Sequence, residues 1–107
     1  MPAHICDLPP IIIVNASSNG NAISQFDDAT ALTIYSPAAL TGVITVETEP
    51  TTTGTNFVTL QSGGTDVTIP AGKATVINKV GWRQMRLVSA ASEGGTRTFP
   101  VTKTIDL

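Results

Sequence analysis

Hydrophobic and polar residues alternate along most of this chain. In the segment 43–49 (VITVETE), Ile44, Val46 and Thr48 fall on one face, and the remaining residues fall on the other. In the segment 30–36, Leu32 and Ile34 alternate with polar positions in the same way. Successive side chains of a strand point to opposite sides, so a period of two residues predicts a β-strand. Both segments are therefore predicted to be strands.

Turn-forming residues separate the alternating segments at intervals of about 8–12 residues. The clearest turn sequences are NASSNGN, SGG and PAG, which begin at Asn15, Ser62 and Pro70. Short strands with regular turns are typical of β-sandwiches and barrels. We expect an all-β fold, a single antiparallel β-sandwich (jelly-roll or Ig-like) of about eight strands. Further strands are predicted over 56–61, 66–69, 73–80, 84–90 and 98–107.

The N-terminal residues differ from the rest of the chain. Three prolines lie within the first ten residues, and two of them, Pro9 and Pro10, are adjacent. Proline has no amide donor and a fixed φ, so this stretch is predicted to be extended and not to be a central strand. We therefore expect an extended N-terminal arm over residues 1–14, followed by a β-sandwich domain over residues 15–107.

The arm ends in four strongly β-forming residues, Ile11, Ile12, Ile13 and Val14, which are the expected partner-binding residues. The arm could leave its own domain and pair with a neighbouring chain by β-augmentation. Burial of the four side chains would contribute about 6–12 kcal/mol before ordering costs. Alternatively, the four residues form the first strand of their own sandwich. Both interpretations hold if the strand is exchanged between copies.

Charge is scarce, which limits the classes of partner. Charged residues make up 13% of the chain, about half the usual fraction, and threonine supplies much of the polarity. The formal net charge is −2, and the basic residues all lie between Lys73 and Lys103. Binding to DNA requires several phosphates to be neutralised together. We therefore expect no nucleic-acid partner.

The sequence also limits the expected location. Cys6 is the only cysteine, so no intrachain disulfide is expected and an oxidising compartment is not implied. The N-terminus lacks the pattern of a signal peptide, and the apolar run at residues 11–14 is far shorter than a membrane span. We expect a protein made and used in the cytoplasm or carried inside a larger particle, without a membrane partner.

Candidate metal ligands are weak. His4, Cys6 and Asp7 lie together, but one histidine and one cysteine do not complete a zinc site in a monomer. Asp27 and Asp28 could hold calcium, although adjacent carboxylates in a short loop are more often a solvated turn. We expect no metal and no cofactor.

Candidate catalytic groups are equally weak. The single histidine, His4, lies in the proline-rich arm, away from any aligned nucleophile. Glu47 and Glu49 fall on the same face of one predicted strand, which is the ordinary pattern of a solvated sheet face. Gly72 and Lys73 lack the other residues of a phosphate-binding loop. We therefore expect that this protein is not an enzyme.

Carbohydrate binding is a further possibility, because many sandwiches carry it. Sugar recognition uses aromatic platforms beside polar groups, and Tyr35 and Trp82 are the candidate platforms. The alternative interpretation is structural: Trp82 would close one end of the sandwich, and Tyr35 would cover the edge of the core.

Several spaced segments together resemble a known kind of protein. They are SPAALTG at 36–42, ITVE at 44–47, TNFVTL at 55–60, PAGK at 70–73 and RLVS at 86–89. Over about residues 31–101 the chain resembles small β-sandwich structural proteins of tailed-phage virions. Residues 1–30 lie outside this resemblance, which carries no catalytic residues.

The resemblance implies a virion structural protein, most simply a capsid cement or decoration protein at capsid subunit junctions. The expected partners are the major capsid protein or other virion proteins, and the protein would be a homo-oligomer or occur in many copies per particle. It would be assembled in the host cytoplasm and located in the virion. The alternative function is a glycan-binding module or a structural part of a phage fibre, neck or tail.

Overall fold

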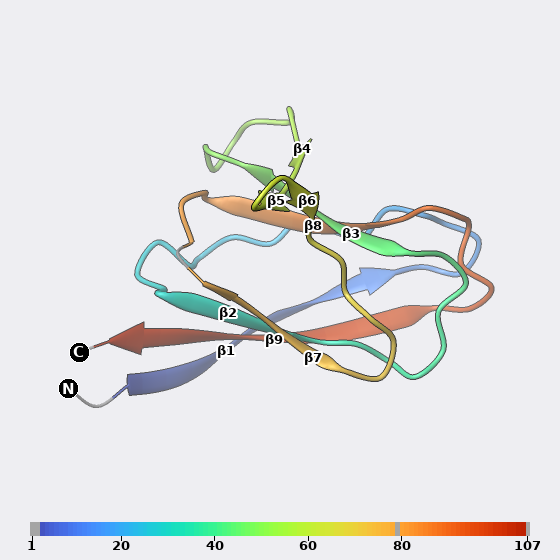
Figure 1. The fold of residues 1–107 in the computed structure, drawn as a ribbon, viewed down its shortest axis with the longest axis horizontal. Helices are drawn as coiled ribbons and strands as arrows, with labels where there is room; N and C mark the ends of the chain where they lie inside the picture. The colour runs from blue at the N-terminus through green and yellow to red at the C-terminus, as the bar shows by residue number, and fades with distance from the viewer. Residues whose placement is uncertain (1–2, 79, 107) are drawn as a thin grey trace.

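The structure, a computed structural model, describes residues 3–78 and 80–106, and this part of the chain contains strands and no helix. The strands are antiparallel and form two facing sheets with a small additional hairpin (Figure 1). This confirms the all-β, sandwich-like fold expected from the alternation. The strands are β1 (Ala3–Ile13), β2 (Ala31–Tyr35), β3 (Ile44–Glu49), β4 (Val58–Thr59), β5 (Gln61–Ser62), β6 (Thr65–Asp66), β7 (Ala74–Asn78), β8 (Gln84–Ser89) and β9 (Arg97–Asp106).

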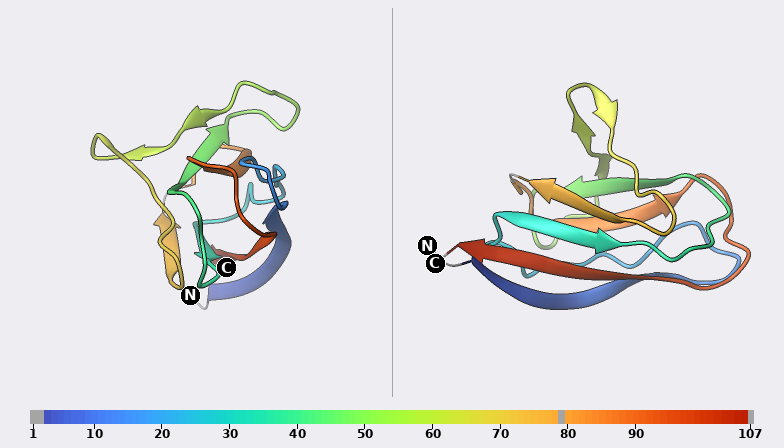
Figure 2. Two further views of the ribbon diagram at one scale, coloured as in Figure 1. Left: turned by 90° about the vertical axis from the view of Figure 1, so that its right-hand side faces the viewer. Right: turned by 60° about the horizontal axis from the view of Figure 1, so that its bottom comes forward.

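The larger sheet has the strand order β1-β9-β2-β7, and the facing sheet has the order β4-β3-β8. The β5–β6 hairpin projects from the side of the smaller sheet, above the edge at β7 (Figure 2). The start of β1 and the end of β9 lie together at one end of the molecule, because these two strands pair antiparallel along their length. The outer face of the larger sheet, which points away from the smaller sheet, is not covered by any other described element (Figure 2).

The core lies between the two sheets and is built from the inward positions of each strand. Leu32 and Ile34 of β2 are fully buried, as the alternation predicted, and so are Val46 of β3 and Phe99 of β9. Phe26, from the irregular segment before β2, is also fully buried. The buried hydrophobic residues are Leu8, Ile11, Ile13, Ile23, Phe26, Leu32, Ile34, Ile44, Val46, Ile69, Ile77, Met85, Leu87, Phe99 and Val101.

The N-terminal segment is part of the sandwich in this structure. Residues 3–13 form the edge strand β1, and Ile11 pairs with Phe99 of β9. The side chains of Ile11 and Ile13 are fully buried in the core, whereas Ile12 and Val14 are exposed. The expected division into an arm over 1–14 and a domain from residue 15 therefore does not follow the packing of the single chain. The alternative, a first strand of the chain's own sheet, matches this geometry.

The two prolines lie where the ladder between β1 and β9 is irregular. Leu8 pairs with Val101 and Ile11 pairs with Phe99, so the register shifts by one residue across Pro9 and Pro10. Proline is tolerated there because an edge strand has one side without ladder partners. The prediction that this stretch is extended but not a central strand agrees with its place at the edge.

Candidate functional site

The outer face of the larger sheet carries mainly threonine and hydrophobic side chains along its central rows. Its exposed hydrophobic residues include Ile5, Tyr35 and Val76, whose side chains are 73%, 45% and 56% exposed. In the two rows that cross all four strands, Asp7 is the only ionisable residue. Threonine occupies both middle positions of the first row and one of the two middle positions of the second. The rows are Asp7-Thr102-Thr33-Val76 and Ile5-Thr104-Ala31-Asn78, in the strand order β1-β9-β2-β7.

Two of the described cations, Lys103 and Arg86, are held away from this face. Lys103 of β9 points toward the other side of the sheet, where its Nζ donates to Asp28 Oδ1 at 2.9 Å and to the carbonyl of Gln25 at 2.8 Å. The hydrogen bond from Lys103 holds the pKa of the Asp28 carboxyl below its usual value. Arg86 of β8 lies 4.4 Å from the Phe57 ring centroid. The outer face of the larger sheet thereby stays nearly neutral.

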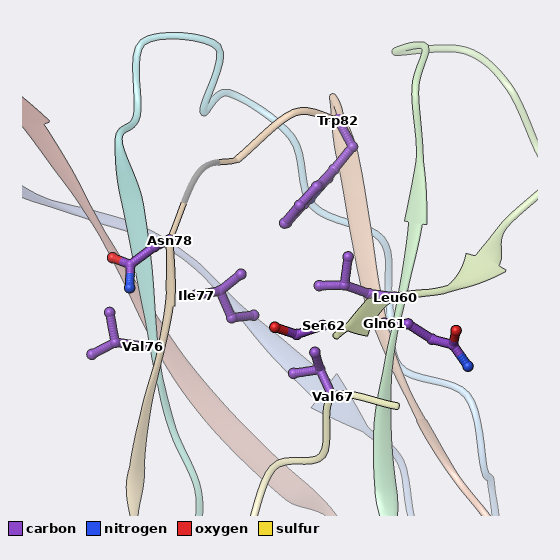
Figure 3. A pocket seen from close by; sticks show the side chains of 8 residues that line it. All are labelled: Leu60, Gln61, Ser62, Val67, Val76, Ile77, Asn78 and Trp82. Atoms are coloured by element: carbon purple, nitrogen blue, oxygen red, sulfur yellow. The ribbon is translucent and has the colours of Figure 1, made fainter. Parts of the chain in front are cut away.

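A groove lies on the open side of the sandwich, between β7 and the segment that carries the β5–β6 hairpin (Figure 3). It has a volume of about 480 Å³, and none of the described residues that line it is charged. The indole Nε1 of Trp82 is buried and has no hydrogen-bond partner among the described residues. A buried donor without a partner carries a desolvation cost of about 1–3 kcal/mol. The lining residues are Leu60, Gln61, Ser62, Val67, Val76, Ile77, Asn78 and Trp82.

The structure does not bring the two candidate glycan platforms together. Tyr35 pairs with Ala74 at one end of the β2–β7 ladder, whereas Trp82 follows the other end, at which Ala31 pairs with Asn78. Trp82 is half-buried and packs against the core, and Tyr35 is exposed. A single surface with both rings as platforms is therefore absent, and only Trp82 lines the groove.

The candidate metal and catalytic residues are dispersed or already paired. Within residues 3–78 and 80–106, no three His, Cys, Asp or Glu side chains are grouped to hold a metal ion. His4 is exposed. Cys6, two residues further along β1 and on the same face, is half-buried. Asp27 lies 3.7 Å from Arg83, and Asp28 bonds to Lys103, so both carboxylates face cations of the chain itself.

Two buried carboxylates hold the loops at opposite ends of the smaller sheet, and neither was predicted from the sequence. Glu93 has 1% exposure and accepts four hydrogen bonds. The donors are the backbone N–H groups of Thr41 (2.8 Å) and Gly42 (2.9 Å), the hydroxyl of Ser89 (2.7 Å) and Nε of Arg97 (2.9 Å). Burial acts to raise the pKa of Glu93, but the hydrogen bonds outweigh it and lower the pKa to about 2.

Glu49 plays the same part at the other end. Its carboxylate accepts from the N–H and hydroxyl of Thr51, both at 3.0 Å, and from the N–H of Asn56 at 3.1 Å. The expectation that Glu47 and Glu49 share a solvated face is wrong, because the loop after β3 folds over Glu49 and leaves it 4% exposed. Glu47 is half-buried and pairs with Arg86 at 2.7 Å.

Comparison with known proteins gives no match: no protein-family model, curated protein or solved structure is significantly similar to this chain. No helix able to cross a membrane occurs in the part of the chain that the structure describes.

Proposed function

We propose that this protein is a virion structural protein that decorates an assembled capsid by docking on its subunits. The observation that carries the proposal is the nearly uncharged, threonine-rich outer face of the β1-β9-β2-β7 sheet. The resemblance over residues 31–101 supports the same function. The mechanism is passive: a rigid sandwich presents a fixed surface to a repeating protein lattice.

The chemistry of this face favours a protein surface as the partner. Charged groups are depleted at the cores of protein interfaces, because burial of an unpaired charge costs far more than burial of a methyl or hydroxyl group. Threonine presents a methyl and a hydroxyl that can bond to a partner or to bridging water. Thr33 and Thr102 lie directly opposite each other at the centre of the face. A partner can cover them without burying an unpaired charge.

Rigidity supports the proposal as well. The central threonines of the docking face lie on β9 and β2, each of which is paired with a neighbouring strand on both sides. A preorganised surface loses little conformational entropy on binding, so modest contacts suffice when the lattice offers many equivalent sites.

The test places a charge at the centre of the face. Thr33→Arg is expected to lower occupancy on purified particles that lack this protein by at least about tenfold, because the guanidinium would be desolvated at the contact. Co-sedimentation of the particles with increasing protein gives the occupancy. Thr59→Arg, at an exposed position on β4 of the other sheet, is the matched control and should bind like the wild type. Equal occupancy for Thr33→Arg and the wild type would contradict docking through this face.

A second function, binding of a neutral saccharide, is favoured by the groove at Trp82. The groove combines apolar side chains of Leu60, Val67 and Ile77 with the hydroxyl of Ser62 (Figure 3), and the Trp82 N–H requires an acceptor. A sugar ring offers acceptor oxygens and an apolar face in the same molecule. The described lining residues are uncharged, which suits a neutral ligand.

Trp82→Phe separates this function from a purely structural role of the ring. The variant keeps an aromatic side chain and removes a donor that has no partner, so its thermal stability should equal or exceed that of the wild type. Glycan-array screening followed by calorimetry should then show at least about tenfold weaker binding for Trp82→Phe. Tyr35→Phe, at the other end of the ladder, should bind normally. An array without signal for the wild type would exclude this second function.

A further inference from the structure

The free edge of β1 has unpaired backbone groups whose positions follow from the ladder. Ile5 is directly opposite Thr104 of β9, and the carbonyl of Thr104 accepts from the N–H of Thr30 on the far side, at 2.8 Å. The N–H and C=O of one strand residue point to the same side, so Thr104 faces away from β1. Ile5 and Thr104 are therefore a non-hydrogen-bonded pair. The N–H and C=O of Ile5, and of Asp7 two residues further on, face the open edge.

The second half of β1 is protected, and the first half is not. The side chain of Asn21 accepts from the N–H of Ile12 at 2.7 Å and donates to the carbonyl of Pro10 at 3.3 Å. The outer edge of β8 is likewise covered, since Ile23 and Met85 exchange backbone bonds of 2.8 and 3.0 Å. Native edges are commonly blocked by lysine, proline or a bulge. The stretch from residue 3 to residue 8 carries none of these.

We propose that two copies of this chain pair through residues 3–7 of β1, antiparallel and around a twofold axis at Ile5, to form one continuous eight-stranded sheet. The larger sheets of the two copies then lie side by side, joined by about six backbone hydrogen bonds. Ile5, which is 73% exposed in the single chain, meets its own copy across the axis. The proposal concerns self-association and is independent of the proposed function.

The charge pattern selects this register. Residues opposite each other must share a face, so the axis passes through one residue of the strand. An axis at Asp7 would place two carboxylates directly opposite each other and bring the prolines into the ladder. An axis at Cys6 would leave the two Asp7 carboxylates about 7 Å apart, whereas an axis at Ile5 separates them by about 14 Å, beyond the screening length at physiological salt. The apolar Ile5 pair is the favourable centre.

A second copy of this chain is the partner that fits the free edge of β1. A twofold axis perpendicular to the sheet makes the two β1 strands antiparallel without any rearrangement. The same strand edge forms the contact in both copies. The opposite edge of the sheet, at β7, is overhung by the β5–β6 hairpin, which restricts the approach of a whole domain there (Figure 2). The edge of β1 carries no such projection.

The first experiment measures mass by light scattering over a concentration series of the full chain. The wild type should approach twice the monomer mass with increasing concentration. Ile5→Lys should weaken dimerisation at least about tenfold, because it removes apolar contact area and places two ammonium groups together at the axis. Val76→Lys, the same kind of change on the opposite edge strand, should dimerise like the wild type. A monomeric wild type at every concentration, or loss of the dimer in Val76→Lys but not in Ile5→Lys, would overturn the proposal.

Cross-linking tests the register and excludes strand exchange. In a Cys6→Ser background, Ile5→Cys should form an interchain disulfide under mild oxidation, and Val76→Cys should not. A second pair, Asp7→Cys with Thr102→Cys, lies at a non-hydrogen-bonded position that suits a disulfide within one chain. The dimer should persist when this bond locks β1 onto its own β9. If the 7–102 disulfide instead forms between chains, the copies exchange β1 and the edge-pairing proposal is wrong.

Discussion

At the scale of single residues, one buried carboxylate explains how two loops distant in sequence are held together. Glu93 joins the loop before β3, through Thr41 and Gly42, to the loop between β8 and β9. The fit is close, because a Cβ at Gly42 would lie 2.6 Å from the Ser89 hydroxyl oxygen. Glycine is therefore required at this approach for steric reasons and not for a left-handed backbone.

This carboxylate also sets an expected pH dependence. The pKa of Glu93 is about 2 in the folded chain and near 4.5 when unfolded, so its contribution is complete above pH 4.5 and is lost as the pH falls toward 2. By linkage the contribution is about 3 kcal/mol. Glu93→Gln should lower the free energy of unfolding at pH 7 by about 2–4 kcal/mol, because Arg97 loses its charged partner.

Chemical denaturation at a series of pH values between 7 and 2 checks this prediction. The difference in unfolding free energy between the wild type and Glu93→Gln should shrink below pH 4.5. Asp66→Asn removes one negative charge from the exposed hairpin and serves as the charge-matched control. A difference for Glu93→Gln that does not change with pH would show that the ionised carboxylate is not what stabilises the loops.

At the scale of elements, the strands could be predicted where one face of the sheet is buried. Alternation gave β2, β3, β8 and β9 to within a residue or two, since burial of one face imposes a period of two. The segment 56–61 failed in part: it contains the short strand β4 (Val58–Thr59), both of whose residues are exposed, and only the first residue of β5. Without a buried face, the same β-forming residues carry no information about pairing.

The remaining misses have a common physical cause, which is long-range contact. The alternation within its own strand predicts that Glu49 is exposed to solvent. The loop that follows β3 in the sequence folds back and buries it. The pairing of β1 with β9 joins residues near the two ends, so local sequence left open whether the N-terminal segment packs on its own domain. Trp82 was predicted as a candidate platform or a structural plug. Only the folded chain places it in the groove, with its N–H unpartnered.

At the scale of the whole molecule, the neutral face and the free edge belong to the same sheet. Pairing of two β1 edges would join two outer faces into one surface, with their threonine rows side by side. A dimer would then contact a lattice through two faces at once. The second contact forms at a high effective concentration, so the dimer should bind more tightly than either copy alone, provided that the lattice spacing admits both.

This coupling predicts unequal effects from two similar substitutions. Ile5→Lys and Val76→Lys each place one ammonium group at the margin of the outer face, so each should weaken docking on particles through desolvation. Only Ile5→Lys also removes the dimer, and it should therefore bind at least about tenfold more weakly than Val76→Lys. Co-sedimentation at protein concentrations where the wild type is dimeric measures both affinities. Equal affinities would mean that the copies dock singly, with the β1 edge contributing self-association but no avidity.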